Sequence, residues 1–175
     1  MLTLNFDDLI EYTDWERQKW LDWFRGRGDQ VLKISAGPHG DGRFATAGDL
    51  VRHIFSAETR YVDRLSARPL TDTGSIPNDN VEALFRFGQT GREALRAFIN
   101  SFPAQRWDVP EELNIGTYSL KATPRKIITH VVLHEIRHWA QLATLFRLNG
   151  LTGEFHDFLF SPAMSGGREG EQAKA

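Results

Sequence analysis

The sequence contains no cysteine, so disulfides, thiolate metal sites and a protein thiol nucleophile are all excluded. It also has no run of about 18 apolar residues, the length that a membrane-spanning helix needs. Neither sign of charge dominates, because 21 Lys and Arg residues stand against 23 Asp and Glu residues, and a formal net charge of -2 gives no general attraction to nucleic acid. We therefore expect neither a membrane nor a nucleic acid as partner.

The amino-terminal residues also lack the features of an export signal. No basic stretch followed by an apolar one is present, and acidic residues begin at Asp7, so we expect a cytoplasmic location. A chain of 175 residues, with 41% hydrophobic and 25% charged residues, fits one globular domain with its own core. We assign this domain to residues 1–162 and expect the segment 163–175, rich in Gly, Glu and Lys, to be disordered.

Four segments have apolar residues spaced as on one face of a helix. They are residues 7–25, 50–65, 81–100 and 124–149. Thr46 with Asp49 resembles a capping box before the second segment, and Thr123 followed by Pro124 is a typical start for the fourth. Residues 107–120 alternate as short strands do. The pattern predicts an all-α protein, a four-helix bundle with a small extended or hairpin crossover before the last helix.

Three histidines stand four residues apart in the last predicted helix, at His130, His134 and His138. Four residues rotate the helix by about 400°, so the three imidazoles form one stripe. Imidazole is a common ligand of zinc and suits nickel and iron, and two at this spacing can converge on one ion. A single buried histidine is more often a core residue, but three at this interval favour metal binding. His53 in the second helix, with Arg60 on its side, is either another core residue or the ligand that completes the site.

Residues 134–138 also spell HExxH, the pattern in which two histidines hold zinc and the glutamate, here Glu135, acts as general base in zinc peptidases. The surrounding sequence argues against a peptidase. The extended pattern with a later glycine and third histidine is absent from residues 139–144, and no glutamate ligand is evident on a separate downstream helix. A zinc metallopeptidase is therefore the lesser alternative.

The segment 130–141, with residues 145–150 and 156–160, resembles the last helix and tail of the DinB/YfiT-like family of metalloenzymes. The resemblance extends to residues 53–65, because that family also has a histidine early in its second helix, before an aromatic and acidic stretch. Many members carry Arg-Gly-Gln after the last histidine, whereas this chain has Trp-Ala-Gln at residues 139–141. The resemblance implies the same four-helix bundle over most of the chain.

The resemblance also implies a metal site. In such proteins the histidine of the second helix and the last two of the final helix hold a divalent metal, which corresponds here to His53, His134 and His138. His130 is then a neighbour of the site and not a ligand. Zinc and nickel are the expected ions because both accept imidazole ligands.

Three neutral imidazoles leave a coordination position open, as in catalytic zinc sites. Because known family activities include thiol-dependent transferases and isomerases, we expect the metal to activate a low-molecular-weight thiol or a water for attack on a small electrophile. The alternative is a catalytically silent metal-binding stress-response protein. The candidate general bases are Glu58, His130 and Glu135, although the two glutamates could be solvated helix charges and His130 could orient His134. A homodimer is also expected, because proteins of this kind often pair through long helix faces.

Overall fold

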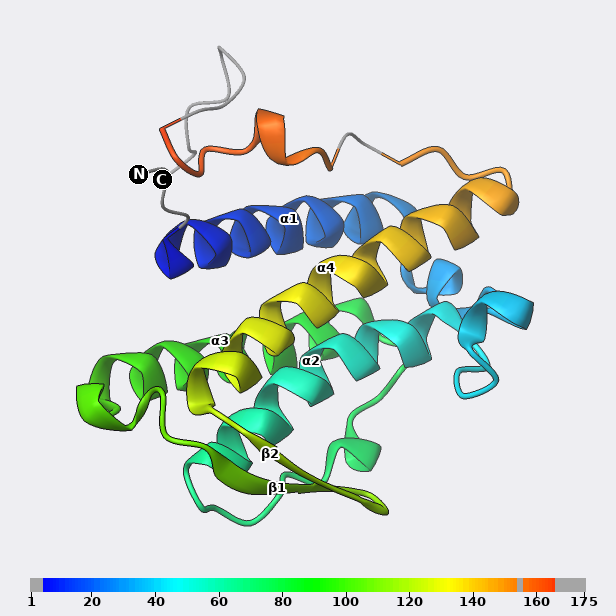
Figure 1. The fold of residues 1–175 in the computed structure, drawn as a ribbon. Helices are drawn as coiled ribbons and strands as arrows, with labels where there is room; N and C mark the ends of the chain where they lie inside the picture. The colour runs from blue at the N-terminus through cyan, green and yellow to red at the C-terminus, as the bar shows by residue number, and fades with distance from the viewer. Residues whose placement is uncertain (1–4, 154–155, 166–175) are drawn as a thin grey trace.

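The computed structural model describes residues 5–153 and 156–165, and these are mostly helical (Figure 1). The described part of the chain contains four α-helices, five short 3-10 helices and one two-stranded antiparallel hairpin, and the hairpin precedes the last helix as predicted. The elements are α1 (Phe6–Arg27), α2 (Ala47–Leu65), α3 (Val81–Ser101), β1 (Glu111–Ile115), β2 (Tyr118–Ala122) and α4 (Pro124–Leu148). The glycine-rich connector after α1 contains two short 3-10 helices, Asp29–Lys33 and Gly37–Gly40, which the sequence pattern did not predict.

Polar side chains fix the start of α2 and α4. The predicted capping box is present, with the Asp49 backbone N–H donating to Thr46 Oγ1 at 3.2 Å and the Thr46 backbone N–H donating to Asp49 Oδ2 at 3.1 Å. Thr123 caps α4 by accepting from the Lys126 backbone N–H at 3.1 Å, with Pro124 at the first helical position. Such caps satisfy backbone donors that have no partner within the helix, and each contributes about 1 kcal/mol.

Two glycines of α3 allow this helix to lie close against α2. A Cβ atom at Gly88 would be 2.7 Å from the Phe55 ring, and one at Gly91 would be 2.7 Å from Thr59 Oγ1. Both distances are too short for any side chain, so the close approach depends on glycine at these positions. Helix α2 therefore lies between α3 on one side and α4 on the other.

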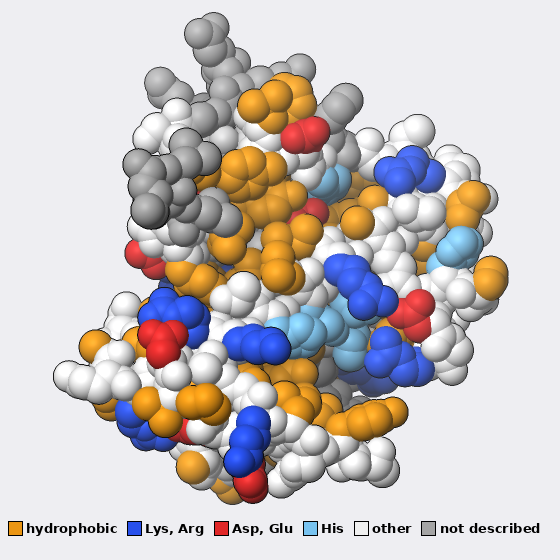
Figure 2. Space-filling model, viewed as in Figure 1, with side chains coloured by type: hydrophobic (Ala, Val, Ile, Leu, Met, Phe, Trp, Pro, Cys, Tyr) orange, Lys and Arg blue, Asp and Glu red, His pale blue; other side chains and the backbone are white. Residues whose placement is uncertain are grey.

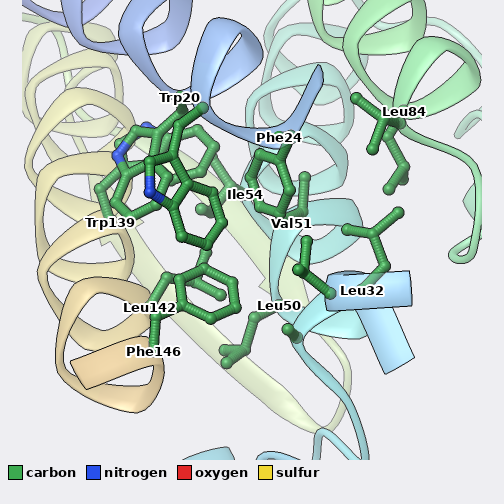
Figure 3. Packing of buried hydrophobic residues seen from close by; sticks show 14 of the residues in the cluster. Trp20, Phe24, Leu32, Leu50, Val51, Ile54, Leu84, Trp139, Leu142 and Phe146 are labelled. Carbon is green, nitrogen blue, oxygen red and sulfur yellow. The ribbon is translucent and has the colours of Figure 1, made fainter. Parts of the chain in front are cut away.

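The larger hydrophobic core is formed by residues of all four helices and of the connector after α1, and it contains stacked aromatic rings (Figure 3). Trp20 of α1 and Trp139 of α4 stack with their ring centroids 5.3 Å apart, and Phe24 and Phe146 pack beside them. All four side chains are buried. Burial of each large apolar side chain contributes about 1.5–3 kcal/mol. Trp139 is thus a core residue.

The segment after α4 runs back along α1 (Figure 1). Trp23 Nε1 donates to the carbonyl of Thr152 at 3.1 Å, and the Tyr12 hydroxyl donates to the carbonyl of His156 at 2.9 Å. Of the stretch expected to be disordered, residues 163–165 form a turn in which Ala163 is buried, and the others lie outside the described residues. No helix within the described ranges is long and apolar enough to cross a membrane.

Candidate metal centre

Three histidines from two adjacent helices meet on one side of the molecule. His53 comes from α2, and His134 and His138 come from successive turns of α4. The Nε2 atom of His134 lies 3.0 Å from His53 Nε2 and 3.1 Å from His138 Nε2. One ligand atom from each of the three residues lies within 4.8 Å of the other two. We call these three residues the histidine cluster; they could hold a metal ion.

Two of the three nitrogen–nitrogen distances are close to those around a tetrahedral ion. Two nitrogens bound at about 2.1 Å to such an ion lie roughly 3.4 Å apart. The separations of 3.0 and 3.1 Å in the cluster are within a few tenths of an ångström of this value. The third pair, His53 and His138, is within 4.8 Å, so the three side chains could hold a divalent cation.

The side chain of Gln141 determines which nitrogen of His138 carries the hydrogen. The Gln141 amide nitrogen donates to the backbone carbonyl of His39, and this bond orients the amide so that its oxygen faces His138. That oxygen can only accept, so His138 Nδ1 donates to it, at 2.6 Å. The lone pair of His138 is then on Nε2, which points to the cluster. Histidines that bind metals typically donate a hydrogen bond of this kind from the ring nitrogen that does not bind the metal.

All three imidazoles are held in the neutral form that a metal requires. Burial, together with the nearby His138 and Arg43, lowers the pKa of His53 to about 4. Burial also lowers the pKa of His134 to about 3, with added effects of His138 and His53, and burial lowers the pKa of His138. Protonation of any one ring is unfavourable because it places a positive charge beside its neighbours.

The histidine cluster lies in the wall of a pocket of about 510 Å³, within the range for small-molecule sites. Figure 2 shows histidine side chains at the middle of this face, surrounded by basic side chains. His130 also lines the pocket, and its ring centroid is 5.5 Å from that of His134 and 5.4 Å from that of Tyr61. His130 therefore stands beside the three converging nitrogens and is not one of the group.

The other two candidate general bases, Glu58 and Glu135, do not line this pocket. Glu135 accepts from Arg17 Nε at 2.6 Å and from Arg92 Nη2 at 2.6 Å, while Glu58 lies 2.9 Å from Arg17 Nη2 and 3.1 Å from Arg92 Nη2. Each glutamate is only 2% exposed, so the interpretation of both as solvated helix charges is wrong. We call Arg17, Glu58, Arg92 and Glu135 the arginine–glutamate cluster.

Several polar residues of the pocket had no role assigned from the sequence. Arg60 and Arg64 follow His53 by seven and eleven residues, so helical periodicity was a signal that placed them on its face. Arg43 comes from the connector before α2, where no periodic pattern exists. Gln141, beside the pocket, follows His138 by three residues, so helical spacing was a signal for their contact. Its contact with the carbonyl of His39, 102 residues away in sequence, left no local signal.

The fold and the cluster together define a mostly helical protein with a histidine site that could hold a metal ion. The model of the DinB family matches residues 1–172, nearly the whole chain, so the chain belongs to the DinB family. The family expected from the sequence is thus confirmed. A search of curated proteins finds no match.

Proposed function

We propose that this protein is a metal-dependent enzyme with the four-helix bundle expected of its family, in which His53, His134 and His138 hold a divalent ion, zinc or nickel. The reaction is attack of a thiol or a water on a small electrophile. The observation that supports the proposal is the convergence of three neutral imidazoles at a pocket of substrate size. Family membership supports it independently.

Three imidazoles leave a fourth position open, as in catalytic zinc sites. An ion bound there would lower the pKa of a water to about 7 and deprotonate a coordinating thiol. Because the chain has no cysteine, the thiol is a low-molecular-weight cosubstrate. Gln141 holds the His138 ring in place, and His130 is the candidate general base that faces the pocket.

The peptidase alternative conflicts with the position of Glu135. In an HExxH peptidase the glutamate must reach the metal-bound water. Here both carboxylate oxygens of Glu135 accept from arginines, and Oε1 also accepts from Trp139 Nε1 at 3.0 Å. A buried carboxylate with these partners is stabilised as an anion and has no access to the pocket.

The metal site is tested by the metal content of untagged protein, measured by inductively coupled plasma mass spectrometry. We expect close to one divalent ion per chain, with loss of the ion in His53→Ala and retention in His130→Ala. The His130 variant is a matched control because it removes a pocket imidazole that stands outside the converging group. Metal content that is indifferent to His53 would contradict the assigned site.

The reaction is tested by incubating metal-loaded protein with glutathione and an epoxide or chlorinated compound, and following thiol loss colorimetrically. We expect loss that depends on metal and is abolished in His134→Ala. Bound metal without thiol loss or hydrolysis of the electrophile would instead indicate a catalytically silent metal-binding protein. The homodimer, the cytoplasmic location and the lack of nucleic-acid and membrane partners stay predictions, and light scattering tests the dimer.

A further inference from the structure

The walls of the pocket beside the histidine cluster carry an excess of positive charge. Four arginines line it, and none of its lining residues is Asp or Glu. The arginines are Arg43, Arg60, Arg64 and Arg137. The nearest carboxylate to two of them is that of Asp41, which lies 3.5 Å from Arg43 and 3.9 Å from Arg137. The carboxylate of Asp63 also acts on Arg64, but it is buried and pairs with Arg68 at 3.0 Å, so the four guanidinium groups leave a cationic surface (Figure 2).

Arg60 differs from the other three because it has no partner among the described residues. Arg64 donates to the backbone carbonyls of Asn114 at 3.2 Å and of Arg60 at 3.1 Å. The side chain of Arg60 forms no ion pair or hydrogen bond within the described ranges, and its Nε atom is buried. A buried N–H group without an acceptor is uncommon and costly, so Arg60 retains a binding capacity that the protein itself does not satisfy.

Arg60 and Arg64 also repel each other. They stand four residues apart on α2, the spacing at which side chains on one face are neighbours. Burial and the positive charge of Arg60 lower the pKa of Arg64. An anion placed between the two guanidinium groups would neutralise this repulsion and supply the missing acceptor for Arg60.

We propose that the pocket binds a substrate with a carboxylate or phosphate group, which pairs with Arg60 and Arg64 while the reactive end of the molecule lies at the histidine cluster. This inference rests on the proposed function, since it takes the pocket as the substrate site. Arg60 lies seven residues beyond His53, or about 10 Å along the helix axis, which suits an elongated molecule. The planar guanidinium group matches carboxylate and phosphate oxygens in pairs.

The proposal is tested by isothermal titration of the full-length protein with succinate, with inorganic phosphate and with neutral succinamide. We expect one or both anions to bind in the millimolar range and succinamide not to bind. Arg60→Gln should weaken anion binding about tenfold, the loss of one charge-assisted contact, and Arg60→Lys by less. Arg86→Gln is the matched control, because Arg86 is an exposed arginine on α3 that lines a different pocket.

Each titration is run on metal-free and on zinc-loaded protein, because an anion could also bind zinc directly. Anion binding to the metal-free protein that is lost with Arg60→Gln supports the proposal, whether or not the metal centre is confirmed. Unchanged metal content in Arg60→Gln would show that the anion site and the metal site are separate. Binding of neither anion to metal-free protein, or equal weakening by Arg60→Gln and Arg86→Gln, would overturn it. The tighter-bound anion identifies the charged group of the substrate.

Discussion

Helices α2 and α4 each contribute to two clusters of ionisable residues that lie in contrasting surroundings. The histidine cluster uses His53 and His134 and lines an open pocket with cationic walls. The arginine–glutamate cluster uses Glu58 and Glu135 of the same helices, and each of these is 2% exposed. Adjacent residues of one helix, His134 and Glu135, therefore belong to different clusters.

The two clusters differ in how their polar atoms are satisfied. In the arginine–glutamate cluster each charge has a partner of opposite sign, and two further donors reach the carbonyl of Gly88 and the hydroxyl of Thr13. Arg92 Nε and Glu58 Oε1 have no hydrogen-bond partner among the described residues. In the histidine cluster the nitrogens face one another without an opposite charge. Partners that neutralise one another indicate a structural role, whereas converging neutral imidazoles could hold an added cation. A helix turns by about 100° per residue, so neighbouring residues of a motif such as HExxH lie on different faces. The role of each residue then depends on the face that it occupies.

The largest predicted effect comes from the buried cluster. Glu135→Gln leaves Glu58 as the one buried carboxylate that Arg17 and Arg92 share, since the other partner of Arg92, Asp14, is partly exposed. We expect the free energy of unfolding to fall by about 3 kcal/mol. Urea unfolding followed by circular dichroism measures this change. Glu82→Gln is the matched control, because its pairing with Arg25 is exposed and should contribute far less. Equal losses in the two variants would show that the buried cluster has no special structural role.

Much of the fold could be predicted from local signals. The caps at Thr46 and Thr123 and the alternation before α4 predicted helix starts and the hairpin, because these features depend on neighbouring residues. The arginine–glutamate cluster could not be predicted, because Arg17 and Arg92 meet the glutamates only through the packing of all four helices. His134 and His138 were visible as a spacing, whereas His53 was placed with them only by the family resemblance.

The second prediction tests whether a neighbouring side chain orients the histidine cluster for metal binding. Gln141→Ala removes the acceptor that orients His138, and we expect zinc to bind about 10- to 100-fold more weakly. Competition with a chromophoric chelator measures the affinity. Gln89→Ala, an exposed glutamine of α3 that pairs with Glu93, is the control and should leave zinc affinity unchanged. Unchanged affinity in Gln141→Ala would show that packing alone positions the His138 ring.

The smallest predicted effect concerns Glu16, a buried carboxyl group of α1 that has no arginine partner among the described residues. Burial, together with the charge of Glu135, raises its pKa to about 8. The folded protein then keeps a proton that the unfolded chain releases near pH 4.5, so stability falls as the pH rises from about 4.5 to about 8.

Glu16→Gln should remove this dependence, because glutamine mimics the protonated carboxyl group at every pH. Relative to the parent protein, we expect the variant's free energy of unfolding to rise by roughly 1 kcal/mol between pH 5 and pH 8. This is less than the full pKa shift implies, because the ionised group can relax toward water and the nearby His156. Urea unfolding at both pH values measures the gain, with the exposed Glu11→Gln on the same helix as control. If the difference in free energy of unfolding between the parent and Glu16→Gln were the same at both pH values, Glu16 would be ionised in the folded protein. A buried carboxylate would then not need arginine partners such as those of Glu58 and Glu135.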